Sequence, residues 1–530
     1  MNWHSTRKGI FSNMSQLASK PYILAVDIGT TSAKTLVIRG TDGHVMAGHS
    51  VEYPMFTPRA DVAEQDPDEI CEAVTGAVAA VMTKADIPAE KLLCISFSSA
   101  MHGLIAVDEQ GKPLTNLITW ADNRAVQTAD IIKKEHKGRS IYMRTGTPIH
   151  PMSPFVKLVW MKESMPDIHQ NAYKFIGIKE YVMHRWFGQY VVDYSIASAT
   201  GLFNLNHLEW DKEALALAGI TPDRLSTPVS TVHVLEGIEA SIARRMGILS
   251  TTPGVVGASD GVLANLGSGA FEHGVWAVSI GTSGAVRAVT RKPLTDPEGR
   301  LFCYALKEDF WVVGGAINNG GIMFRWVRDT LATLEAEEGR RRGMDPYDYL
   351  TQLAASVPAG SGGLIFLPLL AGERAPYWNA NARGVYFGLS LAHTKSHMIR
   401  AVLEGVMYRI HSVAEALTGL VGEPEEIRAS GGFARSEFWR QMLADVMGTT
   451  LSVPDAIEAS GLGAAQLGLF AMGEVKDFSG IHNWVKAGTR HVKHQENHDV
   501  YKRLTPLYQK VYHQLSREFD EIAAFQKEQL

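Results

Sequence analysis

Residues 22–38 of the chain read Tyr-Ile-Leu-Ala-Val-Asp-Ile-Gly-Thr-Thr-Ser-Ala-Lys-Thr-Leu-Val-Ile, two apolar runs joined by a short polar turn with one glycine. Such runs on either side of a glycine turn predict a β-hairpin. The pattern returns at residues 277–285 as Ala-Val-Ser-Ile-Gly-Thr-Ser-Gly-Ala, with Ser279 where the first copy has Asp27. Two copies of one hairpin predict two domains of similar build that face each other; a chance match between two glycine turns is the alternative.

Both turns have a chemistry that suits phosphate. Backbone N–H groups and hydroxyls share a small space, and glycine lets a ligand approach the backbone closely. Two such turns on opposing domains would hold a polyphosphate from both sides, whereas a single copy is more simply an ordinary hairpin turn. Asp27, at the end of the first apolar run, would hold Mg²⁺ directly or through water, and Lys34 is near enough in sequence to reach the phosphates.

The composition is that of an average globular protein. Of 530 residues, 45% are hydrophobic and 20% are charged, so disorder is not the dominant state. The net charge of −5 lacks the basic excess of a duplex-binding protein, so no nucleic-acid partner is expected. Cys71, Cys94 and Cys303 are too far apart for a disulfide scaffold or a thiolate-rich metal site. No apolar stretch is long enough to span a bilayer, and residues 1–20 lack the apolar core of a signal peptide, so we expect no membrane partner and a cytoplasmic enzyme.

The usual nucleotide-binding signatures are absent, because the chain contains no G-x-x-x-x-G-K-[ST] and no strand-borne G-x-G-x-x-G. Seven other segments carry a resemblance. They are Asp27-Ile-Gly-Thr-Thr-Ser32, Glu64-Gln-Asp-Pro67, Ala100-Met-His-Gly103, Trp120-Ala-Asp-Asn-Arg124, Gly257-Ala-Ser-Asp260, Ala371-Gly-Glu-Arg-Ala-Pro376 and Ser430-Gly-Gly432. With these segments in this order, the chain resembles the FGGY carbohydrate kinases from about residue 21 to about residue 510.

The resemblance implies an α/β fold. It would be a two-domain, actin-like ATPase of the hexokinase, Hsp70 and actin superfamily, with ribonuclease H-like domains and an interdomain cleft. The turn Thr252-Pro-Gly254 is a plausible domain boundary. We therefore expect a polar N-terminal extension over residues 1–20, a sugar-side domain over 21–252, a nucleotide-side domain over 253–490 and a helical tail over 491–530.

Within that family the chain resembles the subfamily that phosphorylates gluconate, on the segments 95–102, 144–151, 178–181 and 194–199. This implies the ATP-dependent conversion of D-gluconate, a sugar acid, into 6-phospho-D-gluconate, with ATP and Mg²⁺ bound. Another kinase of the family, acting on xylulose, another pentulose or glycerol, is the nearest alternative. A nucleotide-switched binding protein of the Hsp70 or actin type is a remote one. A homodimer is left open.

The resemblance implies that Asp260 is the catalytic base. A sugar hydroxyl needs an acceptor for its proton as it attacks, and a carboxylate with an ordinary pKa near ~4 is already ionised. The residues themselves leave two alternatives. Gly257-x-Ser259-x-Gly261 matches the nucleophile elbow of hydrolases, which requires a strand before the serine, a helix after it, and a downstream acid and histidine. Asp260 is also a candidate helix cap.

The resemblance also implies a nucleotide site between the two hairpins. Asp27 would assist Mg²⁺ through water. The residues that would hold phosphates are Gly29, Thr30, Thr31, Lys34, Gly281 and Thr282. Gly431, Gly432 and Ser436 would lie by the adenosine, and Gly314, Gly315 and Asn318 near the nucleotide. Glu373 and Arg374 are more simply a structural ion pair than a catalytic one.

The sugar would be met by Met101, His102, Met152 and Asp260. His102 can donate to or accept from a polyol, although a buried histidine satisfied by the protein itself is the alternative. A sugar acid also needs a cation or backbone donors for its carboxylate, and Arg124, Lys157 and His150 are the candidates. Trp120 and Trp160 are more simply core residues. His491, His494 and His498 have the spacing of a helical metal site, with a solvated linker as the alternative.

Overall fold

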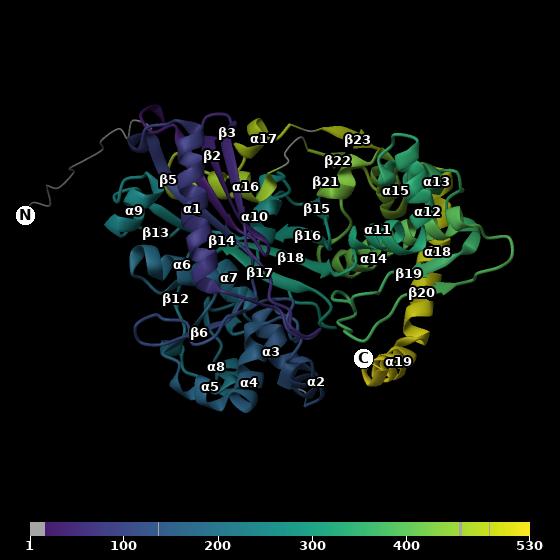
Figure 1. Ribbon diagram of the computed structural model, residues 1–530, viewed down its shortest axis with the longest axis horizontal. Coiled ribbons are helices and arrows are strands. Elements are labelled where there is room, and N and C mark those ends of the chain that lie inside the picture. Colours follow the sequence, from purple (N-terminus) through teal and green to yellow (C-terminus); the bar gives the residue numbers. More distant parts are fainter. Residues whose placement is uncertain (1–15, 136, 455–457, 487, 530) are drawn as a thin grey trace, which may run out of the picture.

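The computed structural model describes residues 16–135, 137–454, 458–486 and 488–529. Two β-sheets lie side by side, one in the half of the molecule drawn in purple and blue and one in the half drawn in green (Figure 1). Residues 1–15 of the predicted N-terminal extension lie outside the described residues, and residues 16–18 form a single 3-10 turn.

The first sheet has six strands, and its centre is the predicted hairpin. In order across the sheet they are β13 (Val234–Leu235), β14 (Gly254–Ser259), β5 (Leu92–Ser99), β1 (Tyr22–Ile28), β2 (Ser32–Arg39) and β3 (Val45–Glu52). Strand β1 pairs antiparallel with β2 and parallel with β5. Side chains on both faces of β1 are buried, which is why its sequence is an almost continuous apolar run.

The second sheet has seven strands, and its centre is the second copy of the hairpin. In order they are β17 (Phe302–Lys307), β18 (Phe310–Ile317), β16 (Gly284–Thr290), β15 (Val275–Ile280), β21 (Glu426–Ser430), β22 (Leu451–Val453) and β23 (Thr489–His491). Strand β15 pairs antiparallel with β16 and parallel with β21, as β1 does with β2 and β5. The predicted repeat is therefore confirmed, and Ser279 occupies in the second sheet the place of Asp27 in the first.

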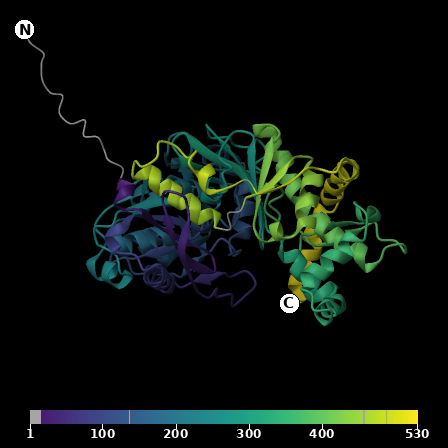
Figure 2. The same ribbon diagram turned by 90° about the horizontal axis from the view of Figure 1, so that it is seen from above.

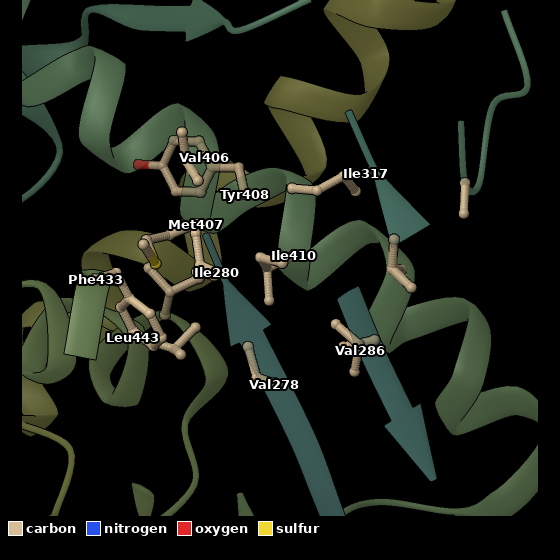
Figure 3. Close-up of a cluster of buried hydrophobic side chains, with 14 of the residues drawn as sticks. Val278, Ile280, Val286, Ile317, Val406, Met407, Tyr408, Ile410, Phe433 and Leu443 are labelled. Atoms are coloured by element: carbon tan, nitrogen blue, oxygen red, sulfur yellow. The ribbon is translucent and has the colours of Figure 1, made fainter. Parts of the chain in front are cut away.

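Helices separate and cover the sheets. Helix α1 (Pro67–Ala85) covers the outer face of the first sheet, and it begins after Asp66, whose carboxylate accepts from two N–H groups of the first turn. Helices α10 (Asp260–Gly267) and α16 (Ala459–Ala471) fill the space between the sheets. Helix α14 (Lys395–Val421) covers the far face of the second sheet, where Val278, Ile280 and Val286 pack against it (Figure 3).

The remaining elements surround this core. The other helices are α2 (Val126–Lys134), α3 (Lys137–Thr145), α4 (Pro154–Ser164), α5 (Pro166–Asn171), α6 (Ile178–Phe187), α7 (Tyr194–Ala199), α8 (Lys212–Ala218), α9 (Ala240–Met246), α11 (Ile322–Trp326), α12 (Thr333–Arg341), α13 (Pro346–Ala355), α15 (Glu437–Met447), α17 (Ile481–Trp484), α18 (Gln495–Gln514) and α19 (Ser516–Gln529). The short strand pairs are β4 (Glu64–Gln65) with β7 (Leu117–Ile118), β6 (Ile105–Val107) with β8 (Lys174–Ile176), β9 (Val191–Asp193) with β12 (Thr227–Val229), β10 (Phe203–Asn204) with β11 (Glu209–Trp210), and β19 (Ile365–Leu367) with β20 (Val385–Phe387).

The chain crosses between the halves more than once. Helix α16 comes late in the sequence, yet it lies beside the first sheet, in contact with β1, β5 and α10 (Figures 1 and 2). Gly267 and Gly463 allow this close approach, since a Cβ on Gly267 would lie 1.7 Å from the carbonyl oxygen of Ala459. The first structural unit is therefore completed by residues of the second half of the sequence.

The predicted boundary at residues 252 and 253 is corrected by the sheet pairing. Strand β14 follows that boundary but pairs in parallel with β5 in the first sheet, and the second sheet begins only at Val275. The boundary lies between the end of α10 and the start of β15. At the other end, β23 includes His491 and pairs with β22, so the predicted tail begins inside the second sheet. Helix α18 then buries one face, as expected. Among the described residues, no helix combines the length and apolarity of a membrane span.

Candidate active site

A cavity of about 270 Å³ lies between the inner face of the second sheet and loops of the first half. The second sheet contributes Ser279 of β15 and the alternate side chains Ala285 and Arg287 of β16 and Phe302 and Tyr304 of β17. The first half contributes the loops after β1, β5 and β7 and the start of α10. The lining residues include Thr30, Met101, His102, Trp120, Met152, Asp260, Ser279, Gly281, Arg287, Tyr304, Arg374 and Trp378.

Asp260 lines this cavity at the first position of α10, directly after β14. Its Oδ1 accepts a hydrogen bond from the backbone N–H of Gly261 at 2.6 Å. Burial and the negative charge of Asp27 raise the pKa of Asp260 to about 6, while the Arg287 guanidinium opposes the rise. The carboxylate is therefore not the ordinary one expected from the sequence, but at neutral pH it is still ionised and can accept a proton.

The neighbouring Ser259 has the strand before it and the helix after it that a nucleophile elbow requires. Its side chain is fully buried, however, and its hydroxyl accepts a hydrogen bond from Ser195 at 2.9 Å rather than meeting a histidine. The hydrolase alternative therefore has no support in the geometry.

Asp27 lies at the end of β1, with both carboxylate oxygens occupied. Ser98 on β5 donates to Oδ1 at 2.7 Å, and Ser460 on α16 donates to Oδ2 at 2.8 Å. Burial raises its pKa. Since Mg²⁺ prefers oxygen ligands and keeps several waters, a partly buried carboxylate beside a turn that is predicted to bind phosphate fits an ion held through water. Within the described ranges, no three His, Cys, Asp or Glu side chains gather as a metal-binding group, so an ion here would need phosphate oxygens as well.

Of the first turn, only Thr30 lines the cavity; its hydroxyl accepts from the indole N–H of Trp120 at 3.0 Å. The Lys34 ammonium instead forms an ion pair with Glu458 at 2.6 Å, on a different surface hollow. The structure thus does not place Lys34 at this cavity, although Lys34 pairs with Asp27 across the hairpin and its charge lowers the pKa of Asp27.

The second turn forms a cluster of glycines. Gly321 N–H donates to the carbonyl of Gly281 at 2.7 Å, and Gly320 N–H donates to that of Thr282 at 3.1 Å. Gly431 lies against the same hairpin with φ of +96°, where a Cβ would be 2.5 Å from the carbonyl oxygen of Ile280. The structure therefore brings Gly281, Thr282, Gly431 and the adjacent Gly432 together. The sequence analysis missed Gly320 and Gly321, although a Gly-Gly pair after a strand is itself a turn signal.

Four predicted nucleotide residues have other roles in the structure. Gly314 and Gly315 lie buried inside β18, where a Cβ would collide with the Val286 carbonyl or with Ala375 and Val413, so these glycines serve packing. Asn318 accepts from Arg374 and so orients that guanidinium. Ser436 caps α15 by accepting from the N–H of Trp439.

His102 lines the cavity with φ of +70°. Its Nδ1 lies 2.8 Å from the carbonyl oxygen of Ala199 and must therefore carry a proton that it donates there. Burial, with the nearby charges of Lys157 and Arg374, lowers its pKa to about 3, so the ring is neutral. Nε2 is then an acceptor on the side of Tyr304. His102 is thus a buried histidine with a partner in the protein, and it also lines the cavity, so the structure is compatible with both interpretations made from the sequence, a sugar contact and a structural histidine.

Lys157 is fully buried and joins three loops of the cavity wall. Its ammonium donates to the carbonyl oxygens of His102 and Thr119 at 2.7 Å and of Met152 at 2.8 Å. Burial lowers its pKa to about 7. Because carbonyl oxygens already accept from its N–H groups, the Lys157 ammonium is not available to a substrate carboxylate. Burial lowers the pKa of His150 well below its usual value, so the His150 ring is neutral and offers no charge to a carboxylate either.

Arg124 does not line the cavity. Its guanidinium pairs with Asp122 at 2.8 Å and Glu64 at 2.5 Å and lies over the ring of Trp160. The prediction that it contacts the substrate is corrected, since two carboxylates already neutralise it. Trp120, assigned to the core from the sequence, instead lines the cavity.

The cavity contains two arginines that sequence reasoning missed. Arg287 lies on β16, and the one sequence signal for it is a charge inside an apolar strand. Arg374 was assigned to an ion pair with Glu373. That assignment is wrong, because the Glu373 carboxylate pairs with Arg409 at 3.1 Å and the Arg374 side chain turns to the cavity.

Comparison with known proteins gives a consistent result. Residues 22–267 match the N-terminal domain of the FGGY family of carbohydrate kinases, and residues 276–472 match its C-terminal domain. The chain is 49% identical over 507 residues to a gluconokinase from Bacillus licheniformis, which covers 96% of this chain and 98% of that protein.

Two crystal structures from Lactobacillus acidophilus superpose on the chain equally well. One is of a gluconate kinase and one is of a ligand-bound xylulose kinase. Each has a TM-score of 0.89 and 35% identity, and each match covers 94% of this chain and 99% of the other. The gap between the two matched domains, residues 268–275, coincides with the boundary set by the sheets.

Proposed function

Because the chain belongs to the FGGY family of carbohydrate kinases, we propose that it transfers the terminal phosphoryl group of ATP to D-gluconate, giving ADP and 6-phospho-D-gluconate. The observation that carries the choice of sugar is the 49% identity to a gluconokinase over nearly the whole of both chains. The cavity agrees with an acidic sugar, since its lining includes two arginines and one aspartate.

In the proposed reaction Asp260 is the base. Its ionised carboxylate accepts the proton of the terminal hydroxyl while that oxygen bonds to the γ-phosphorus and the bond to the β–γ bridging oxygen breaks. A pKa of about 6 keeps the group ionised at neutral pH yet closer to the operating pH than an exposed aspartate. Met101, His102 and Met152 would contact the sugar. Nε2 of the neutral His102 would accept from a sugar hydroxyl in place of the Tyr304 hydroxyl, which lies 3.4 Å from it.

The two hairpin turns would hold the phosphates from opposite sides. Gly29, Thr30 and Thr31 belong to one turn and Gly281 and Thr282 to the other. Gly431 and Gly432 would allow the adenosine to approach the backbone beside Ile280. Asp27 would hold Mg²⁺ through water, and the ion would neutralise phosphate charge. The cavity lies between the two halves of the molecule, so an approach of the halves on binding would exclude water, a competing acceptor, from the phosphoryl group.

The nearest alternative is a xylulose kinase, because one of the two superposed crystal structures is of a xylulose kinase and is as similar to this chain as the gluconate kinase structure is. The nucleotide-switched binding protein is set aside, since both halves match carbohydrate kinase domains. A cytoplasmic location, a homodimer and the lack of a nucleic-acid partner stay predictions.

ADP release with Mg·ATP and a panel of D-gluconate, D-xylulose, L-ribulose, glycerol or no sugar tests the proposal. We expect strong release with gluconate alone. Stimulation by a different sugar would overturn the choice of substrate. Asp260→Asn, which keeps the shape but removes the base, should lower turnover by about 10²-fold or more and leave gluconate binding intact. Near-normal turnover in that variant would refute the role of Asp260.

A further inference from the structure

The charges around the cavity do not balance. Asp260 is its one acidic lining residue, and Arg287 and Arg374 are two cations. His102 adds no charge at neutral pH. The two arginines and one aspartate leave the cavity lining with one net positive charge. A neutral sugar has no negative charge to match it, whereas a sugar acid does.

Arg287 forms no ion pair within 4 Å among the described residues, and the negative charge that acts on it from farther away is that of Asp260. It projects from the middle of β16, and its one hydrogen bond to the protein runs from Nη1 to the Ser279 hydroxyl at 3.2 Å. Room for the guanidinium comes from Gly261, where a Cβ would lie 3.0 Å from Nη2. Nε and Nη2 are therefore left to donate into the cavity.

Arg374 is oriented by neutral hydrogen-bond partners and forms no ion pair within 4 Å in the described part of the chain, although the charge of Glu373 raises its pKa from farther away. Its Nε donates to the Asn318 side-chain oxygen at 2.7 Å and its Nη2 to the Ile317 carbonyl at 3.1 Å. The guanidinium lies 5.1 Å from the centre of the Trp120 ring. The adjacent carboxylate, Glu373, is bound to Arg409 instead. Neutral partners orient Arg374, and Nη1 remains for a ligand.

The two guanidinium groups also act on each other. Burial lowers the pKa of both guanidinium groups, and the charges of Asp260 on Arg287 and of Glu373 on Arg374 oppose it. The charge of Arg287 adds to the lowering for Arg374. Holding two like charges in a shared, partly desolvated space is unfavourable unless an anion lies between them. A carboxylate offers two oxygens, and guanidinium groups are the donors that match it best.

We propose that Arg287 and Arg374 together bind the carboxylate of the substrate and so select a sugar acid over a neutral sugar. The inference rests on the proposed function, and it adds the residues that set the specificity. Asn318 is a positioning residue for Arg374. The hydroxyl chain of the substrate then passes His102 toward Asp260.

The test compares two substrates of nearly equal shape, D-gluconate and its uncharged amide, in Arg287→Met and Arg374→Met. Each variant should raise the KM for gluconate by about 100-fold or more, since truncating one partner of a buried charge pair has this effect. The KM for the amide should change only a few-fold. The kcat on both substrates is compared at pH 8.5, since the loss of the Arg287 charge raises the pKa of Asp260, and there it should also change only a few-fold. Arg291→Met is the matched control, because Arg291 follows the same strand but its side chain is 71% exposed; it should behave as wild type.

Thermal stabilisation by Mg·ADP shows that each variant is folded, and Arg374→Lys, which keeps the charge, should recover part of the gluconate affinity. A variant in which gluconate and its amide lose activity equally through kcat would overturn the inference, because the arginine would then serve phosphoryl transfer. A variant with an unchanged preference for gluconate over the amide would also overturn it. A wild-type enzyme that does not use gluconate would instead refute the proposed function.

Discussion

The pair of Glu373 and Arg409 gives a prediction that can be worked out from the structure. Both side chains are 0% exposed, and their N···O distance is 3.1 Å. Glu373 also accepts from the backbone N–H groups of Asn318 at 2.6 Å and Arg374 at 2.8 Å, so it anchors the segment that carries Arg374. Arg409→Met would leave a buried carboxylate without its cation, which costs about 3–5 kcal/mol of the free energy of unfolding.

The matched domain over residues 276–472 sets the scale of the thermal shift. For a domain of this size, each kcal/mol lowers the melting temperature by about 2–4 °C, so Arg409→Met should lower it by about 6–20 °C. In Glu373→Gln/Arg409→Met no buried charge remains, and the double variant should melt above Arg409→Met alone. Differential scanning calorimetry of the wild type, both single variants and the double variant measures this.

Arg342→Met is the control, because Arg342 pairs with Glu338 on an exposed helix surface and should shift the melting temperature by no more than about 4 °C. Two results would refute the reasoning. One is an Arg409→Met protein whose melting temperature is lowered by no more than that of the Arg342→Met control. The other is a double variant whose shift equals the two single shifts added together, since that would mean the side chains do not interact.

Three other predictions concern the site. With a pKa of about 6 for Asp260, the active ionised form is present above this pH and lost as pH falls through it, so kcat/KM for gluconate should fall about tenfold between pH 7.5 and pH 5; a flat profile would contradict the assignment. Lys157→Met removes the donor shared by three carbonyls and should raise the KM for the sugar about tenfold or more, with the KM for ATP as the internal control. Gly431→Ala should raise the KM for ATP severalfold, because Gly431 has φ of +96° and a Cβ there would lie 2.5 Å from the Ile280 carbonyl oxygen. Gly419→Ala in α14, where a Cβ meets no atom within 4 Å, should leave that KM unchanged, and equal effects of the two substitutions would argue against a nucleotide role for Gly431.

The repeat was predictable because its signal is local. Strand β1 is buried on both faces, so its sequence is apolar throughout, and the same strand-turn-strand pattern occurs in β15 and β16. Asp260 could be named because it lies in a short motif whose neighbours are small. In both cases the residues that decide the structure are adjacent in the chain.

The errors came from information that adjacent residues do not carry. The boundary at residue 252 fails because β14 pairs with β5, which lies more than a hundred residues earlier. The sequence does not show that Glu64, sixty residues earlier, joins the nearby Asp122 in neutralising Arg124. It also does not show that Glu373 pairs with Arg409 rather than with its neighbour Arg374. Gly314 and Gly315 show that a sequence does not distinguish two uses of glycine. A glycine that is required for close packing in a strand cannot be told from one that lets a ligand approach the backbone.

The position of α16 has a consequence for the order in which the chain can fold. The inner face of the first sheet, which includes Ile23 and Ala25, is covered by α10 and α16, and about 190 residues separate these two helices in the sequence. At about 5–20 residues per second, a ribosome needs roughly 10–40 s to synthesise that interval. During this time the nascent N-terminal half presents an apolar sheet face without its final cover, and Asp27 lacks the hydroxyl of Ser460. The proposed phosphate site of the first half is thus finished only when nearly the whole chain has been made.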